Sequence, residues 1–208
     1  MTEIILSVSL ESAGCFSIGE GTPGEVDIEI QHDENGFPFL SGKALKGLLH
    51  EEAAELAFAL NYAGSTKDWR AVSDRVFGAP GSTISEQGLV KVSDLQLPAD
   101  FRERINKAIQ RKDIRASQVL RLLTSKRTQT AVDESGAPMP ETLRTLRIIP
   151  RETTFFGSVF YEDLDKDQEV FLYGCLRALR RAGSNKSRGL GRLCINFRQE
   201  KDFSEEDF

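Results

Sequence analysis

The stretch Gly183-Ser184-Asn185-Lys186-Ser187-Arg188-Gly189-Leu190-Gly191-Arg192 connects a predicted helix over 168–181 with a predicted strand over 193–197. Its glycines allow positive φ and close approach to another backbone, and its Ser, Asn and cationic side chains suit phosphate and ribose. A tight connection from helix to strand does not need so many cations. The stretch therefore predicts a phosphate-binding loop, with candidate contacts Gly183, Ser184, Lys186, Arg188, Gly189 and Arg192.

A second candidate anion site is Ser41-Gly42-Lys43-Ala44-Leu45-Lys46-Gly47, at the start of a predicted helix. Helix N-termini offer free backbone N–H groups and the positive end of the helix dipole, which both favour phosphate. The stretch is not a nucleotide-binding P-loop, because Ala44 stands where such a loop has a magnesium-binding Ser or Thr. The alternative is a simply capped surface helix. The candidate contacts are Ser41, Gly42, Lys43 and Lys46.

A third candidate site is acidic and follows a glycine-rich link. If residues 25–31 are extended, Asp27 and Glu29 point to the side opposite Val26 and Ile28. Such a carboxylate beside bound RNA could hold a divalent ion or accept the proton of a 2′-hydroxyl group. The alternative is a solvated strand edge. Asp33 continues the same acidic spacing.

Hydrophobic periodicity predicts a mixed α+β fold with a sheet covered on one face by helices. Alternating apolar residues predict strands, and leucines at helical spacing predict a helix that begins near Ser41 and a second over 168–181. A basic stretch over 100–123 is predicted to be largely helical. The predicted strands span 3–10, 25–31, 88–92, 128–132, 143–149, 155–161 and 193–197.

The charge of this 208-residue chain is strongly segregated. The net charge is −5, yet 102–127 and 175–198 each carry +7, which leaves −19 for the remaining residues. This segregation predicts one cationic face, as nucleic-acid binding requires, although solvated helix faces would give the same counts. No apolar run approaches the roughly 20 residues of a membrane span. Three widely spaced cysteines are typical of reduced thiols, so we expect a cytoplasmic protein with no membrane partner.

Four segments occur in an order that resembles the RAMP superfamily of CRISPR-associated proteins. Residues 26–50 resemble its "D…G-x-P-x-I-P-G-S-S-L-K-G-x-x-R" segment, and 77–94 resemble its "F-G…G-x-(I/L)-x-(V/F)-x-D" stretch. Residues 127–133 are similar to its "R-T-A-I-D" segment, and 183–192 to its glycine loop. The resemblance is strongest to the backbone subunits of type III effector complexes, including the type III-D group.

This resemblance implies an α+β fold with a modified ferredoxin-like or RNA-recognition-motif core, insertions and a thumb-like β-hairpin. It implies one RAMP domain over 1–208, with its core at about 1–60 and 151–198. The other parts would be insertions at about 61–123, the thumb-like hairpin at about 124–150 and an acidic tail over 199–208.

The resemblance also implies a function. Such a subunit binds guide crRNA along the backbone of the complex and cleaves the paired target RNA with Mg²⁺ or another divalent cation. The catalytic role carries over to Asp27 alone, no metal ligands are assigned, and Arg127 joins the candidate RNA contacts. The implied partners are guide crRNA, target RNA, like backbone subunits and a large polymerase-like subunit.

The sequence departs from the family pattern at several positions, and alternatives stay open. Ser41 replaces a proline, Lys43 and Ala44 replace paired serines, and His50 replaces an arginine. One alternative is a structural RNA-binding subunit in which Asp27 is only polar. Another is a metal-independent endoribonuclease that processes precursor crRNA.

Overall fold

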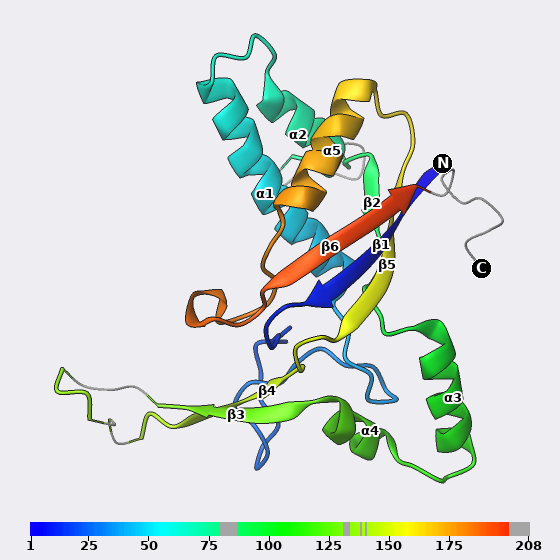
Figure 1. Cartoon of the computed structure of the whole chain (residues 1–208), viewed down its shortest axis with the longest axis vertical. Helices are drawn as coiled ribbons and strands as arrows, with labels where there is room; N and C mark the ends of the chain where they lie inside the picture. The colour runs from blue at the N-terminus through cyan, green and yellow to red at the C-terminus, as the bar shows by residue number, and fades with distance from the viewer. Residues whose placement is uncertain (80–86, 131–133, 138, 140, 200–208) are drawn as a thin grey trace.

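The computed structural model describes residues 1–79, 87–130, 134–137, 139 and 141–199. Its core is an antiparallel four-stranded sheet with strand order β2-β5-β1-β6 (Figure 1). Together with two helices, these strands follow the order β1-α1-β2-β5-α5-β6 along the chain, which is the ferredoxin-like arrangement. The predicted α+β class is therefore confirmed. The strands are β1 (Thr2–Leu10), β2 (Val90–Val92), β5 (Thr154–Tyr161) and β6 (Leu193–Gln199).

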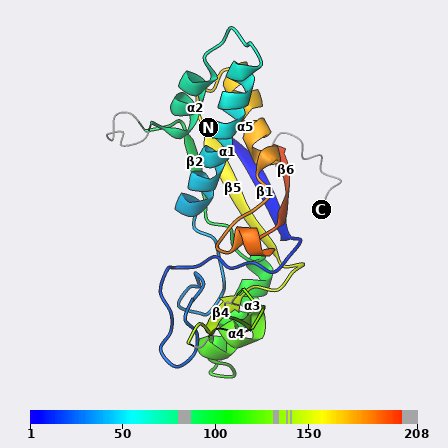
Figure 2. The same cartoon turned by 90° about the vertical axis from the view of Figure 1, so that its left-hand side faces the viewer.

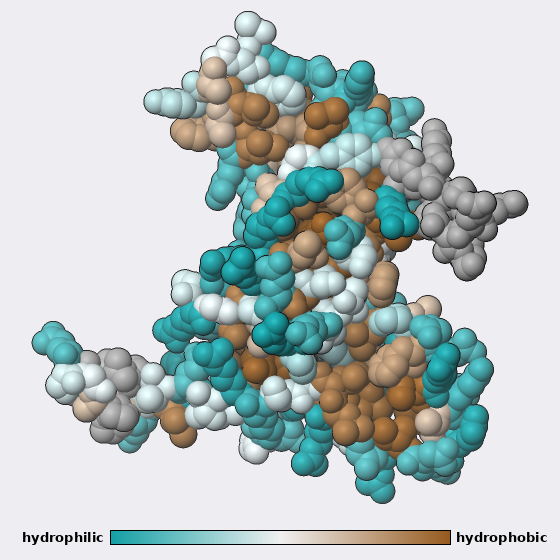
Figure 3. All heavy atoms as spheres, in the orientation of Figure 1, coloured by the Kyte–Doolittle hydropathy of each residue, from teal (hydrophilic) through white to brown (hydrophobic). Residues whose placement is uncertain are grey.

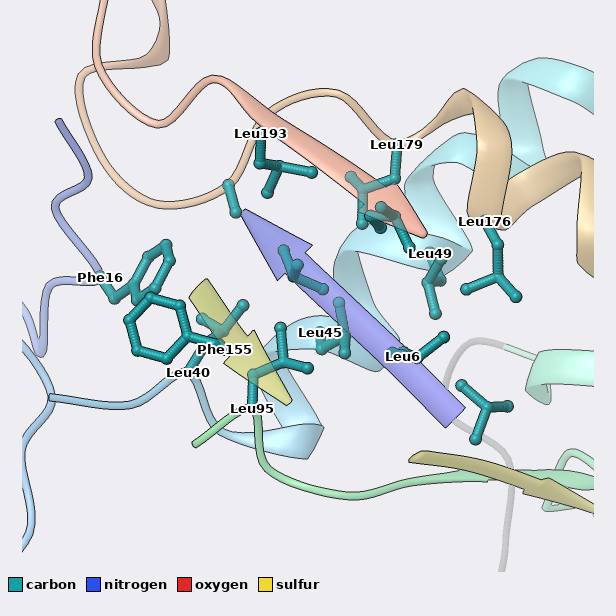
Figure 4. Packing of buried hydrophobic residues seen from close by; sticks show 14 of the residues in the cluster. Leu6, Phe16, Leu40, Leu45, Leu49, Leu95, Phe155, Leu176, Leu179 and Leu193 are labelled. Carbon is teal, nitrogen blue, oxygen red and sulfur yellow. The ribbon is translucent and has the colours of Figure 1, made fainter. Parts of the chain in front are cut away.

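Helices cover one face of this sheet. Every second residue of β1 is buried, from Ile4 to Leu10, and these side chains meet leucines of the two core helices. Figure 4 shows Leu45 and Leu49 of one helix and Leu176 of the other around Leu6. No helix of the described residues has the length and hydrophobicity that a membrane span requires. The helices of this layer are α1 (Gly42–Tyr62), α2 (Trp69–Phe77) and α5 (Lys166–Ala178).

An insertion between β2 and β5 forms the second part of the molecule. The basic stretch predicted as helical forms two helices, because the chain turns at Lys112, which has a φ of 65°. A two-stranded hairpin follows and extends away from the core sheet (Figures 1 and 2). The range 61–123, expected as insertion, also supplies β2 to the core sheet. The inserted elements are α3 (Ala99–Gln110), α4 (Ala116–Leu123), β3 (Ser125–Gln129) and β4 (Arg144–Ile148).

The hairpin agrees with the two predicted strands in place but not in its bounds. Its first strand begins at Ser125 and ends at Gln129, whereas the prediction spanned 128–132. Residues 131 and 132 of that prediction lie outside the described residues, as does the expected tail beyond Gln199. In the space-filling view, hydrophobic residues gather near α3 and α4, and hydrophilic residues cover much of the hairpin (Figure 3).

A long loop over 11–41 lies between β1 and α1 and crosses to the hairpin. It contacts other segments through isolated β-bridges such as Gly14 with Ile149 and Ile28 with Leu146. The strand predicted over 25–31 is therefore wrong as a regular strand of the sheet. The loop lies against β4, which brings the acidic segment to the base of the hairpin.

Candidate nucleic-acid interface

Hydrogen bonds to the loop after β1 fix the glycine loop over 183–192. The Ser184 backbone N–H donates to the Cys15 carbonyl at 2.8 Å, and the Gly191 N–H donates to the Ala13 carbonyl at 2.8 Å. Gly191 has a φ of +73°, and a Cβ there would overlap the carbonyl oxygen of Ala182. This glycine is therefore required by the shape of the loop. By contrast, Gly189 (φ +79°) has open space where a Cβ would stand.

The cations of this loop are on the surface and form only exposed ion pairs. Lys186 lies 3.6 Å from Glu51, and Arg192 lies 3.0 Å from Glu11, with every one of these side chains at least 41% exposed. Arg188 is exposed and extends to the hairpin, where its Nη1 donates to Oε1 of Gln129 at 3.5 Å. Exposed pairs contribute little stability, so these cations can exchange their carboxylate partners for phosphate.

The remaining candidates of the glycine loop, Gly183 and Ser184, make contacts within the folded protein. Ser184 lies partly buried, with its Oγ 2.7 Å from Oγ of Ser17. Gly183 has a φ of +85°, and a Cβ there would overlap the carbonyl oxygen of Cys15. Neither residue therefore offers a free side-chain group to a ligand. Both residues help to hold the loop against the segment after β1.

The start of α1 makes contacts within the protein instead of facing solvent. The Gly42 N–H donates to Oδ1 of Asp94 at 2.7 Å, and a Cβ on Gly42 would overlap the carbonyl oxygen of Val92. An internal carboxylate therefore occupies this helix N-terminus. Ser41 caps the helix by accepting from the Ala44 N–H at 3.3 Å.

The two lysines of this segment differ in their surroundings. Lys46 donates from Nζ to the carbonyl oxygen of Val90 at 2.8 Å, and burial lowers the pKa of Lys46 below its usual value. Lys43 is exposed. These contacts explain Lys46 without any ligand, and they leave Lys43 as the accessible cation of the two.

Asp27 is exposed at the base of the hairpin. The Thr145 backbone N–H donates to Oδ2 of Asp27 at 2.6 Å, and the Asp27 N–H donates to the Thr145 carbonyl at 2.8 Å. Asp33 has a different role, because its Oδ1 accepts from the N–H groups of Asn35 and Phe37 and closes a turn. Of these two carboxylates, Asp27 is the one held at the hairpin.

The expectation that Glu29 shares a solvated face with Asp27 is wrong. The Glu29 side chain is 4% exposed and lies 2.7 Å from Nε of Arg147. Burial alone would raise the pKa of Glu29, but hydrogen bonds from Arg147, from the Ile30 N–H and from Thr22 bring it below its usual value. Glu29 is thus a buried anion that is compensated by a cation and two neutral donors.

Sequence reasoning missed Arg147, whose side chain is 3% exposed. Its Nη2 also lies 2.7 Å from Oε2 of Glu25, and hydrogen bonds to both glutamates outweigh burial and raise its pKa. The feature of the sequence that indicates a buried arginine here is its position within the apolar run of Leu146, Ile148 and Ile149. A cation in such a run must be paired when it is buried.

The hairpin brings the acidic segment and the glycine loop close together. Thr145, which binds Asp27, pairs with Thr128, and the next residue, Gln129, binds Arg188. The hairpin adds the exposed cations Lys126, Arg127 and Arg144. An exposed carboxylate is therefore set beside several exposed cations on a surface that crosses the base of the hairpin.

A divalent ion at this segment would need ligands other than its carboxylates. Within the described ranges, no group of three or more His, Cys, Asp or Glu side chains could hold a metal ion. Asp27 offers one accessible carboxylate. Magnesium is commonly held by one or two carboxylates together with water and substrate phosphates, and Asp27 would supply one such carboxylate.

Solved structures with a similar fold include two cryo-EM structures. One is of the type III-B Cmr-beta bound to cognate target RNA, with a TM-score of 0.67, 14% identity, and coverage of 94% of this chain and 96% of the other. The second is of the type III-B Cmr-beta in the apo state, with a TM-score of 0.64, 14% identity, and coverage of 96% and 98%. No curated protein sequence matches this chain.

Family membership rests on the sequence itself. The model of the RAMP superfamily matches residues 16–194, which include the loop after β1, the hairpin and the glycine loop. The match covers most of the chain and agrees with the ferredoxin-like core. The protein belongs to the RAMP superfamily.

Proposed function

We propose that this chain is a subunit of a type III CRISPR effector complex that binds guide crRNA and cuts the paired target RNA with a divalent ion. Membership of the RAMP superfamily and the likeness to Cmr-beta structures, one of them bound to target RNA, support the proposal. The observation that carries it is Asp27, an exposed carboxylate held at the base of a cationic hairpin. Its proposed partners are guide crRNA, target RNA, like backbone subunits and a large polymerase-like subunit in the cytoplasm.

Guide binding is assigned to the cations of the glycine loop and the hairpin. Lys186, Arg188 and Arg192 would contact phosphates, because a protein that accepts any guide must not depend on base identity. The carboxylate partners of Lys186 and Arg192 are exposed and easily exchanged. Arg127 belongs to the hairpin and extends this cationic surface, and Lys43 is a further exposed cation at the start of α1.

Target cutting is assigned to Asp27. Attack of a 2′-hydroxyl on the adjacent phosphorus forms a 2′,3′-cyclic phosphate and breaks the bond to the 5′ oxygen. It requires a group that accepts the hydroxyl proton, and the leaving 5′ oxygen takes a proton from water. Asp27 can accept that proton, since its carboxylate is exposed and a backbone N–H holds it in one orientation. A divalent ion held by Asp27 and RNA phosphates would stabilise negative charge on the phosphate.

A structural RNA-binding subunit is the second candidate function. The hydrogen bonds between Asp27 and Thr145 favour it, because the same contacts would attach the loop to β4 in a protein that does not cut RNA. Loss of cutting without loss of assembly on substitution of Asp27 separates the two functions.

The proposed contacts between the glycine loop and guide RNA can be tested by substitution. Changing Lys186, Arg188 and Arg192 to Ala should weaken binding of single-stranded RNA by a similar factor for unrelated sequences. The slope of log affinity against log salt should flatten by about 0.7 for each lost phosphate contact. Filter binding at several salt concentrations measures both quantities.

A matched control removes three exposed cations elsewhere. Changing Arg70, Arg75 and Lys91 to Ala gives the same change in net charge, on α2 and β2. This control should leave the salt slope unchanged. Equal effects of the two triple variants, or a loss confined to certain RNA sequences, would contradict a phosphate-binding glycine loop.

A further inference from the structure

The guanidinium of Arg147 holds the chain on both sides of Asp27. It donates from Nε to Oε1 of Glu29 at 2.7 Å and from Nη2 to Oε2 of Glu25 at 2.7 Å. The two glutamates stand two residues after and two residues before Asp27. Because a guanidinium is planar and its N–H groups point in fixed directions, the two contacts set the spacing and orientation of the segment between them.

The strand that carries Arg147 also contacts Asp27 directly. Thr145, two residues earlier on β4, donates to the Asp27 carboxylate at 2.6 Å. The Arg147 backbone N–H donates to the carbonyl oxygen of Ile28 at 3.0 Å. Hydrogen bonds within the loop, such as that of the Glu29 N–H with the Glu20 carbonyl at 2.8 Å, also hold this segment. The direct hydrogen bonds to Asp27 come from β4.

We propose that Arg147 is a positioning residue, which acts through Glu25 and Glu29 to fix the direction of the Asp27 carboxylate. The inference rests on the proposed role of Asp27 in cutting. With 2% of its surface exposed, Arg147 does not itself reach RNA. Its effect is on geometry, and a displacement of about 1 Å in a reacting group can cost about 10²-fold in rate.

Glu25 allows the two-sided hold to be tested without leaving a buried charge unpaired. Its side chain is 47% exposed, whereas that of Glu29 is 4% exposed. In Glu25→Ala, Arg147 keeps its contact with Glu29, while the contacts of Glu25 with Arg147 and Lys126 are lost. Because the Glu25 carboxylate is half exposed, we expect their loss to have little effect on stability. The melting temperature should therefore fall by no more than about 4 °C.

The experiment measures single-turnover and steady-state cutting of a complementary target RNA by the assembled complex with Mg²⁺. Glu25→Ala should lower kcat about tenfold and leave the KM for target RNA and the affinity for guide RNA unchanged. The control is Glu20→Ala, which removes an exposed carboxylate from the same loop. This control should cut at the wild-type rate.

Asp27→Asn is measured in parallel, so that the inference and the proposed function can fail separately. If Asp27→Asn is inactive and Glu25→Ala cuts at the wild-type rate, the positioning role of Arg147 is wrong and the role of Asp27 stands. If Asp27→Asn cuts normally, both are wrong. If Glu25→Ala loses cutting together with a large drop in melting temperature, Glu25 and Arg147 are structural and the inference is overturned.

Discussion

Asp27→Asn should retain guide and target binding and lose target cutting by at least about 10²-fold, because general base catalysis contributes about 10²–10⁴-fold. Asparagine has the shape of aspartate, and its side-chain oxygen can still accept from the Thr145 N–H. It has neither the charge that would hold a divalent ion nor the basicity that would take a proton. Cleavage of labelled target RNA by the assembled complex with Mg²⁺ measures the loss.

Two controls accompany this prediction. Glu34→Gln removes one negative charge from an exposed position of the same loop and should cut normally. EDTA should stop cutting by the wild-type complex without releasing guide RNA. Persistent cutting in EDTA would favour the metal-independent processing nuclease, and undiminished cutting by Asp27→Asn would assign the chemistry to another residue.

The largest effect on stability is expected at Arg147. Arg147→Met fills a similar volume but leaves Glu29 buried without its cation, and removal of one partner of a buried ion pair costs about 3–5 kcal/mol of unfolding free energy. The control is Arg144→Met on the same strand, which is exposed and should change stability by less than about 0.5 kcal/mol. Urea unfolding of the isolated chain at pH 7 measures both.

The pH dependence of stability should reverse in Arg147→Met. In the wild type, the folded state holds the pKa of Glu29 and of Glu25 below their unfolded values, so these groups stabilise the protein above the unfolded pKa. That contribution is lost as pH falls through the lowered pKa. Without Arg147, burial raises the pKa of Glu29, and stability should fall as pH rises above about 4.3. A variant that lost stability on acidification as the wild type does would contradict this account.

The core could be predicted from sequence because its signals are local. The alternation of Ile4, Leu6, Val8 and Leu10 identifies β1, and all four side chains are buried. The helix from Gly42 shows the same agreement between leucine spacing and burial. Such periods follow from backbone geometry alone and do not depend on distant residues.

The site was harder to predict because its geometry depends on residues far apart in sequence. Because alternate residues of a strand point to opposite faces, Glu29 was predicted to face solvent. That prediction holds only for a strand with one solvent-exposed face. Here the segment lies against β4, and Arg147, 118 residues later, makes the buried position favourable. Similarly, nothing near Gly42 in sequence shows that Asp94 occupies the helix N-terminus. A contact between side chains far apart in sequence leaves no periodic pattern of residues from which it could be predicted.

The sheet topology also has a consequence for synthesis of the chain. The first strand is central and pairs on one side with β5 and on the other with β6, which ends at Gln199. At about 5–20 residues per second, a ribosome takes on the order of 10–40 s to proceed from Leu10 to Leu193. During that interval β1 has two open edges until β5 has been made and one open edge until β6 has been made, and such edges lead nascent chains to aggregate or bind chaperones. We therefore expect this protein to fold after translation, with β6 as the closing step.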